Sequence, residues 1–384
     1  MILYAPSILI KTISNSVCYI IIINFNMTNL TPKYYFMKTL KLLFLFILGS
    51  IVSEPSANAC TRVVYKGPEN TVITARSMDW KSEINANLWV FPRGIKRTGE
   101  VGPLSLKWSS KYGSIIASAW DIATADGMNE KGLVANILWL AESKYPKFDP
   151  SGTKQGLSIS LWAQYMLDNF ASVKEAVGSL KDEPFVLVSD YIPGTDKFTS
   201  LHLSISDAYG DNAIFEYIDG KLKIHHDPTY VVMTNSPAFD QQLALNEYWK
   251  GIPGTVMLPG SNRAADRFVR ASYYIHAIPQ TNDIRTSVAS VFSVIRNCSV
   301  PFGISSETEP NISSTRWRSV SDQKNLIYFF ETVLTPNTFW VNLNEFDLSE
   351  NGKVMKLSLD NFATYSGKAN SSFKQMPAFK FLGI

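Results

Sequence analysis

The chain has 384 residues, of which 46% are hydrophobic and 18% charged, a composition that supports a large globular core. The formal net charge of +3 comes from residues 1–59, which hold four lysines and one glutamate; 32 basic and 32 acidic side chains remain in residues 60–384. A neutral body without a basic stripe argues against nucleic acid as a partner.

Residues 37–59 have the order of a signal peptide. A basic start at Met37 is followed by the apolar run Leu42–Leu48 and by a small-x-small cleavage site that ends at Ala59. Cleavage there leaves Cys60 as the first residue, with a free α-amino group. Because the apolar run is too short to span a membrane, we expect a periplasmic or secreted protein without a stable membrane anchor in its mature form.

Two alternatives concern the same region. In the first alternative the protein is a non-catalytic surface lipoprotein with a lipid on Cys60. The signal for lipidation usually has Leu three residues before the cysteine, where this chain has Ala57. Residues 1–36 fit neither a leader nor the fold. Since Met37 opens a complete signal peptide, we interpret them as upstream sequence translated in error, with a membrane-embedded extension through Ile20–Ile23 as the alternative.

After Cys60 the pattern predicts strands first, then helices, then strands again, then helices, and strands at the end. Alternating or β-branched runs bounded by turn residues predict the strands, at Cys60–Tyr65, Thr71–Arg76, Asn87–Phe91, Ser114–Trp120, Gly132–Leu140, Leu201–Ser206, Ala213–Tyr217, Lys221–His225, Tyr230–Thr234, Asn325–Thr332, Thr338–Leu343 and Val354–Ser358. Helical periodicity and caps predict the helices, at Ser158–Phe170, Ser172–Leu180, Phe239–Trp249, Ala264–His276 and Arg285–Ile295. The polar segment Gly127–Gly132 looks like a hairpin turn.

This order, without an internal repeat or a linker, predicts one layered domain over residues 60–384 that combines helices with mainly antiparallel sheets. The mature chain has two cysteines, Cys60 and Cys298, which could form one disulfide in an oxidising compartment. Neither the cysteines nor the four histidines have metal-ligand spacing, so we expect no metal and no other cofactor.

Cys60 is the candidate nucleophile. A thiol needs a base, and an N-terminal cysteine has one in its own α-amine, which titrates at about 7.7–8.0. If the second strand pairs antiparallel with the first, its end returns to Cys60; Arg76 could then lower the pKa of the thiol and Asp79 could hold the amine. A papain-like protease built on Cys298 and a histidine is the rival, but Cys298 has no companion motif.

Several ordered motifs resemble the choloylglycine hydrolase family, which includes bile salt hydrolases and penicillin V acylases and belongs to the N-terminal nucleophile hydrolases. The matching segments span nearly all of residues 60–384: Cys60, Arg76–Trp80, Ala125–Leu133, Thr234–Pro237, Asp266–Phe268, Ser314–Trp317 and Tyr328–Phe329. The resemblance implies a four-layer αββα sandwich with Cys60 at the edge of the sheet pair.

The resemblance also implies roles for single residues. Cys60 would be the nucleophile, Asp79 would bind its amine, and Arg76 would sit beside the thiol. Asn235 would donate its side-chain amide to the oxyanion, and Arg267 would complete the polar cluster. The reaction implied is hydrolysis of a small-molecule linear amide through a thioester on Cys60.

This chain departs from the family pattern at Trp139, where many members have Asn, so a second oxyanion donor would have to be a backbone N–H at or near Trp139. Trp80 and Trp139 together look like the Gram-negative subset and predict an aromatic acyl pocket. Candidate substrates are therefore penicillin V and N-acyl homoserine lactones, with conjugated bile salts ranked last. A homo-oligomer is possible, although the stretch from Asn235 to Arg267 lacks the assembly hairpin of the tetrameric members.

Overall fold

The computed structural model describes residues 60–304, 313–335 and 337–384; the predicted signal peptide over 37–59 and the predicted extension over 1–36 lie outside the described residues. The helices of this part are α2 (Trp162–Asn169), α3 (Val173–Leu180), α4 (Phe239–Lys250), α5 (Ala264–Ala277) and α6 (Ile284–Asn297). None of them is both long enough and apolar enough to cross a membrane.

Two large sheets carry most of the strands. The seven-stranded sheet has the order β14 (Val232–Met233), β1 (Thr61–Lys66), β2 (Val72–Trp80), β15 (Ser314–Asp322), β16 (Ile327–Thr332), β17 (Phe339–Asn342) and β19 (Gly367–Lys368). The nine-stranded sheet has the order β13 (Lys221–His226), β12 (Asn212–Ile218), β11 (Leu201–Ser206), β8 (Val134–Trp139), β7 (Ala123–Asn129), β6 (Ser114–Ala119), β3 (Leu88–Phe91), β18 (Met355–Leu357) and β20 (Lys374–Gln375). Two short pairs, β4 (Lys96–Thr98) with β5 (Lys107–Ser109) and β9 (Gly156–Ser158) with β10 (Val186–Val188), complete the strands.

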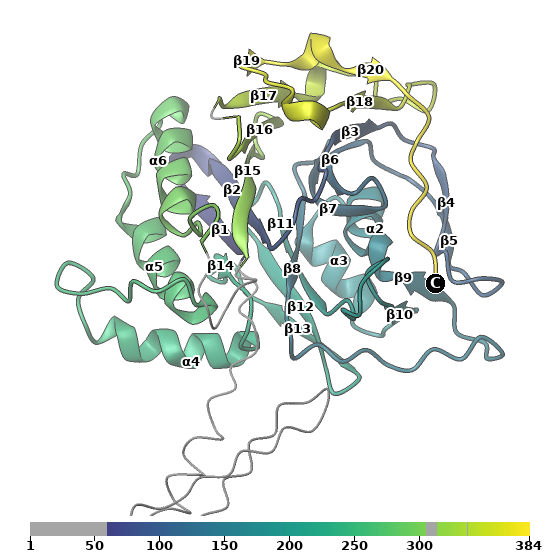
Figure 1. The fold of residues 1–384 in the computed structure, drawn as a ribbon, viewed down its shortest axis with the longest axis horizontal. Coiled ribbons are helices and arrows are strands. Elements are labelled where there is room, and N and C mark those ends of the chain that lie inside the picture. The colour runs from purple at the N-terminus through teal and green to yellow at the C-terminus, as the bar shows by residue number, and fades with distance from the viewer. Residues whose placement is uncertain (1–59, 305–312, 336) are drawn as a thin grey trace, which may run out of the picture. The chain divides into compact units, whose positions relative to one another are not determined.

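The sheets and helices form four layers (Figure 1). Helices α5 and α6 pack on the seven-stranded sheet, with α4 beside α5, and α2 and α3 pack on the nine-stranded sheet. One hydrophobic cluster contains residues of both sheets and of α5 and α6, and a second lies beneath α2 and α3. Because each sheet is covered on both faces, β1, β2, β6 and β8 are buried along nearly their whole length. The predicted four-layer, mainly antiparallel fold is confirmed.

Several strands were not predicted, and two of them, β7 and β15, lie inside the large sheets. Half of the segment predicted as a hairpin turn, Gly127–Asn129, belongs to β7, and the rest makes the turn into β8, which pairs antiparallel with β7. β15 was not predicted as a strand at all. Both strands carry buried polar side chains that mask the usual apolar pattern: Asn129 donates to the carbonyls of Leu167 and Phe170, for example. Hydrogen bonds to other protein groups replace the bonds that these buried side chains would make to water. Polar residues can therefore occupy central strands.

The first hairpin places Cys60. In the antiparallel register of β1 and β2, Thr61 lies opposite Ser77 and Arg62 opposite Arg76, which brings the residue before β1 level with Met78. The turn contains Gly67, whose N–H donates to the carbonyl of Thr71 at 2.8 Å. The predicted strand pairing is therefore confirmed.

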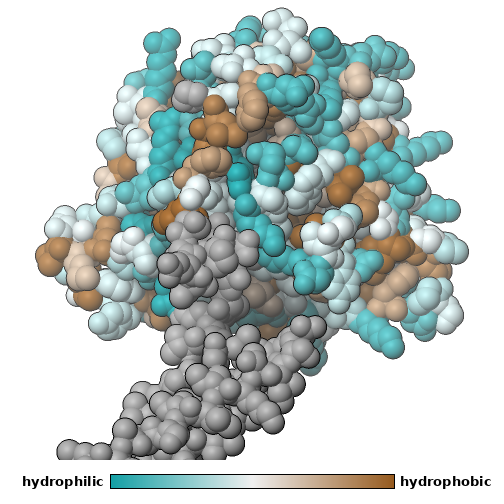
Figure 2. Space-filling model, viewed as in Figure 1, coloured by the Kyte–Doolittle hydropathy of each residue, from teal (hydrophilic) through white to brown (hydrophobic). Residues whose placement is uncertain are grey.

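On the face shown in Figure 2, hydrophilic and hydrophobic residues are interspersed. The large exposed hydrophobic residues include Val256 and Met257 in the connection between α4 and α5.

Candidate active site

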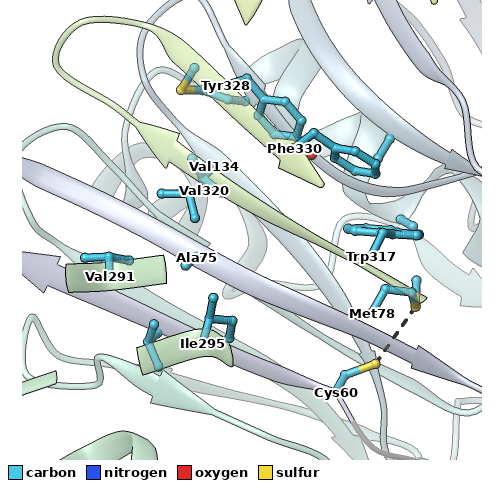
Figure 3. Packing of buried hydrophobic residues seen from close by; sticks show 14 of the residues in the cluster. Cys60, Ala75, Met78, Val134, Val291, Ile295, Trp317, Val320, Tyr328 and Phe330 are labelled. Carbon is cyan, nitrogen blue, oxygen red and sulfur yellow. Dashed lines mark hydrogen bonds between the residues drawn. The ribbon is translucent and has the colours of Figure 1, made fainter. Parts of the chain in front are cut away.

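The thiol of Cys60 lies buried at the start of β1, between the two sheets. Its Sγ is 4.0 Å from Sδ of Met78, and it accepts a hydrogen bond from the backbone N–H of Asp79 at 3.4 Å. Figure 3 shows the two sulfur atoms at one end of the packed core, where β1 and β2 meet. The end of the second strand thus returns to Cys60, as the sequence predicts.

Arg76 holds a fixed positive charge beside the thiol. Its Nη2 is 3.9 Å from Sγ of Cys60 and donates to the carbonyl of Ile137 at 2.9 Å, while Nη1 donates to the carbonyl of Ala125 at 2.9 Å. Asp126 lies 4.0 Å from Nη1. These partners belong to β7 and β8, so the arginine of one sheet is anchored on the other.

The charge of Arg76 and the burial of the thiol oppose each other. Burial raises the pKa of Cys60 and is the larger effect, while Arg76 lowers it. Arg76 therefore acts in the predicted direction, but the net pKa of the thiol lies above its ordinary value. Because residue 59 precedes Cys60 in this chain, the nitrogen of Cys60 is part of a peptide bond here, and a free α-ammonium would add a second positive charge.

Asn235 and Arg267 meet around the backbone of Cys60. The Oδ1 of Asn235 accepts from the Cys60 N–H and from Nη2 of Arg267, the latter at 3.1 Å. Arg267 also donates through Nη1 to the Cys60 carbonyl at 2.6 Å and to Oγ1 of Thr61 at 2.5 Å. Both side chains thus hold the residue that the sequence marks as nucleophile.

Asn235 also touches the predicted oxyanion region, because its Nδ2 donates to the carbonyl of Trp139 at 2.7 Å. The next two N–H groups along the chain are already bonded, that of Leu140 to the Ser200 carbonyl and that of Ala141 to Oγ of Ser236. Successive N–H groups of a strand point to opposite edges, so the N–H of Trp139 faces away from β11, on the side of its own carbonyl and Asn235. The second oxyanion donor at Trp139 stays a prediction, with which this direction of its N–H agrees.

Asp79 lies near the same arginines but does not contact the nitrogen of Cys60. Its Oδ1 accepts a hydrogen bond from Oγ1 of Thr315. Burial raises the pKa of Asp79 to about 6, even though Arg267, Thr315 and Arg76 each lower it. The predicted contact between Asp79 and an α-amine stays a prediction, because this chain has a peptide nitrogen at that position.

An apolar pocket of about 130 Å³ opens beside Cys60 and Arg76. Trp80 and Trp139 form part of its wall, with ring centroids 5.6 Å apart, and Trp120 joins them at 6.3 Å from Trp80. The expected aromatic pocket is therefore present. A larger cavity of about 810 Å³ lies between β14, α4 and α5, and none of the predicted site residues lines it.

The ammonium group of Lys197 covers two of these rings. Its Nζ lies 4.7 Å from the ring centroid of Trp80 and 4.2 Å from that of Trp139. Burial, with a smaller contribution from Lys81, lowers the pKa of Lys197 to about 8. A cation over two indoles is a stabilising arrangement, and it places a positive charge against the wall of the pocket.

Sequence reasoning missed several residues of the site, among them Met78, Thr315 and Trp120. Met78 and Thr315 belong to motifs that were recognised without a role, and both contact the central residues directly. Trp120 was predicted only as the end of a strand. The backbone of Trp120 has φ of +50°, in the left-handed region that non-glycine residues rarely adopt. No local sequence pattern predicts such a conformation.

Cys298 lies apart from this chemistry. Both cysteines of the described chain are free, so the disulfide that the sequence allowed is absent. The thiol of Cys298 is buried and donates to the carbonyl of Arg267 at 3.8 Å. Burial raises its pKa to about 11. Among the described residues, no group of His, Cys, Asp and Glu side chains is arranged to hold a metal ion.

Known proteins share this architecture. The model of the linear amide C–N hydrolases, choloylglycine hydrolase family, matches residues 60–356. The penicillin V acylase of Pectobacterium atrosepticum is 52% identical over 359 residues, which cover 88% of this chain and 94% of that protein.

Solved structures agree with the match. The penicillin V acylase from Agrobacterium tumefaciens has a TM-score of 0.79 at 59% identity, covering 85% of this chain and 100% of that one. A conjugated bile acid hydrolase from Clostridium perfringens, at 22% identity, shares the fold with a TM-score of 0.65 and covers 85% of this chain and 98% of that one.

Fold and site together define the class of the protein: it is an amide hydrolase with the fold of the N-terminal nucleophile hydrolases. More narrowly, the chain belongs to the choloylglycine hydrolase family, whose members hydrolyse linear C–N amide bonds.

Proposed function

We propose that this protein is an exported acylase that removes an aromatic acyl group from a small-molecule amide of the penicillin V type, through a thioester on Cys60. The observation that carries the proposal is the pocket of about 130 Å³ beside the thiol, walled by Trp80, Trp120 and Trp139. An apolar protein cavity of about 150 Å³ holds one benzene ring. A phenoxy group therefore fits the pocket.

The aromatic wall ranks the other candidates. Its indole rings offer an aryl group ring contacts that a flexible alkyl chain does not make. Long-chain N-acyl homoserine lactones therefore rank below penicillin V. A fused-ring steroid nucleus is much larger than a single aromatic ring, so conjugated bile salts rank last.

The proposed chemistry begins at the thiol. The free α-amine of Cys60 takes the thiol proton, and the sulfur attacks the carbonyl carbon of the amide. The oxyanion that forms accepts hydrogen bonds from the Trp139 N–H and from Nδ2 of Asn235, which exchanges its bond to the Trp139 carbonyl for the substrate. Hydrogen-bond donors aimed at the developing negative charge stabilise it strongly.

Collapse of this intermediate breaks the C–N bond. The α-ammonium gives its proton to the departing amine, and the acyl group stays on Cys60 as a thioester. A water molecule, deprotonated by the same amine, then adds to the thioester carbonyl and releases the acid and the thiol. Arg76, 3.9 Å from Sγ, stabilises the thiolate that leaves.

The mechanism requires that the bond between Ala59 and Cys60 be cut. The small-x-small pattern ahead of Cys60 supports removal of a signal peptide, and hence export to the periplasm or the medium. The mass of the purified mature N-terminus tests this step. An unmodified Cys60 with a free amine agrees with the proposal, whereas a lipid on Cys60 would identify the rival lipoprotein.

The activity is tested with mature protein on three amides: penicillin V, a long-chain acyl homoserine lactone and glycocholate. We expect the highest kcat/KM for penicillin V. Cys60→Ala should lower kcat at least about 10³-fold, as the loss of a nucleophile does in other hydrolases, while the matched control Cys298→Ala should keep it within a few-fold. Undiminished hydrolysis by Cys60→Ala would overturn the assignment of the nucleophile.

A further inference from the structure

The end of the chain returns to the acyl pocket. After β20, residues 376–384 run toward β9, as the yellow segment that ends at the C label in Figure 1. Phe379 packs against Trp89 and Phe91, with ring centroids 5.2 Å and 5.9 Å away, and Phe381 packs against Phe379 at 4.7 Å. The guanidinium of Arg97 lies 5.2 Å from the ring of Phe381. These contacts fasten the segment to the body.

Backbone hydrogen bonds fix the segment most firmly at Leu382. Its N–H donates to the carbonyl of Ile122 at 2.8 Å, and its carbonyl accepts from the hydroxyls of Ser158 and Ser160, each at 2.8 Å. Two residues later, the N–H of Ile384 donates to the carbonyl of Glu100 at 2.8 Å. A short terminal segment with both backbone groups of Leu382 bonded is not a frayed end.

Leu382 is also part of the pocket wall. It lines the same cavity of about 130 Å³ that Cys60, Trp80 and Trp139 line, and so do two of its hydrogen-bond partners, Ile122 and Ser160. The family model matches residues 60–356 only, so this part of the wall comes from a segment beyond the matched region.

We propose that Leu382 is a specificity-determining residue that limits the size of the acyl group the pocket accepts. The inference rests on the proposed function, because it needs the pocket to hold the acyl group of the substrate. Residues in the wall of a small apolar cavity limit which acyl groups can be buried there, and Leu382 is not one of the catalytic residues.

The size of the effect follows from the atoms removed. Leu382→Ala takes away three carbon atoms, which leaves space for about two further methylene groups of a substrate at about 30 Å³ each. Burial of one methylene group changes an equilibrium or a rate ratio about fourfold. We therefore expect Leu382→Ala to raise the ratio of kcat/KM for an acyl group two methylenes longer, relative to phenoxyacetyl, by about 16-fold. Leu382→Phe should lower kcat/KM for phenoxyacetyl and leave acetyl amides nearly unaffected.

The experiment measures kcat/KM of the mature enzyme for acetyl, phenoxyacetyl and 4-phenoxybutyryl amides of 6-aminopenicillanic acid. The variants are Leu382→Ala, Leu382→Val and Leu382→Phe, with Ile384→Ala as the matched control, since Ile384 belongs to the same segment but does not line the pocket. Because the bonds of Leu382 come from its backbone, these variants retain the anchors of the segment. Thermal unfolding of each variant checks that it is folded.

The results separate the two proposals. If the wild-type enzyme hydrolyses none of the three amides, the proposed function fails, whatever the variants do. If the wild-type enzyme is active, a preference that follows side-chain size at residue 382 and stays unchanged in Ile384→Ala supports the inference. Acyl preferences of Leu382→Ala and Leu382→Phe equal to that of the wild type would overturn it. Should Leu382→Ala fail to fold, Leu382→Val decides the question with a smaller expected change of about fourfold or less.

Discussion

Replacing Asp79 by asparagine tests the electrostatics of the site. Burial raises the pKa of the Asp79 carboxyl from 3.8 to about 6, against the opposing effects of Arg267, Thr315 and Arg76. A carboxyl group with a raised pKa in the folded state stabilises the fold only while it is protonated. Its contribution is therefore complete below about pH 3.8 and is lost as the pH rises through about 6.

The magnitude follows from the shift. A pKa difference of about two units corresponds to about 3 kcal/mol in the free energy of unfolding. Asparagine has nearly the same shape and no charge at any pH, so Asp79→Asn lacks this dependence. Part of this difference is already expressed at pH 4, so relative to the wild type the unfolding free energy of Asp79→Asn should rise by about 2.4 kcal/mol between pH 4 and pH 7.

The assay is urea denaturation at pH 4, 5, 6 and 7, on protein in which the bond between Ala59 and Cys60 is intact. The control is Asp219→Asn, which makes the same replacement at a carboxylate that is 78% exposed. A constant difference between Asp79→Asn and the wild type would refute the reasoning. In protein with a free α-ammonium on Cys60, the nearby positive charge should lower the pKa of Asp79 and move the dependence to lower pH.

Three further predictions concern single residues. Asn235→Ala should lower kcat for penicillin V about 10²–10³-fold with little change in KM, whereas Asn246→Ala, in α4, should not; equal kinetics would remove Asn235 from the oxyanion site. Trp139→Leu should lower kcat/KM for phenoxyacetyl amides about 2- to 13-fold, the worth of one aromatic pair, and acetyl amides should show no such loss. Burial opposes ionisation of Asp121, but hydrogen bonds from Ser118, Lys356 and Trp89 outweigh it and lower the pKa of the carboxyl group. Asp121→Asn should therefore lower the free energy of unfolding at pH 7. Urea denaturation should show this difference from the wild type becoming smaller below about pH 4.

Local patterns in the sequence predicted most of the regular elements. The turn at Asp219 and Gly220, where both residues have positive φ, separates β12 from β13 as expected. The predicted cap at Ser172 is also present, with its hydroxyl accepting from the Glu175 N–H at 3.2 Å. Such features are decided within a few residues, so they can be seen without the tertiary structure.

Central polar strands escaped the same reasoning. The pattern of β15 does not alternate between apolar and polar residues, because Ser319 and Ser321 are buried along with their neighbours. Only pairing with β2 on one side and β16 on the other makes it a strand. Polar side chains can be buried where residues from distant segments form hydrogen bonds with them. A local sequence pattern does not reveal those distant partners.

The position of Cys60 after a small-x-small pattern, the return of the second strand and the family motifs were determined by the sequence alone. Only the tertiary structure decided that Asn235 and Arg267 meet at the backbone of Cys60, that burial outweighs Arg76 in setting the pKa of the thiol, and that Leu382 joins the pocket wall. The physical reason is the same in each case: charge, burial and cavity volume depend on distances between segments that lie far apart in the chain.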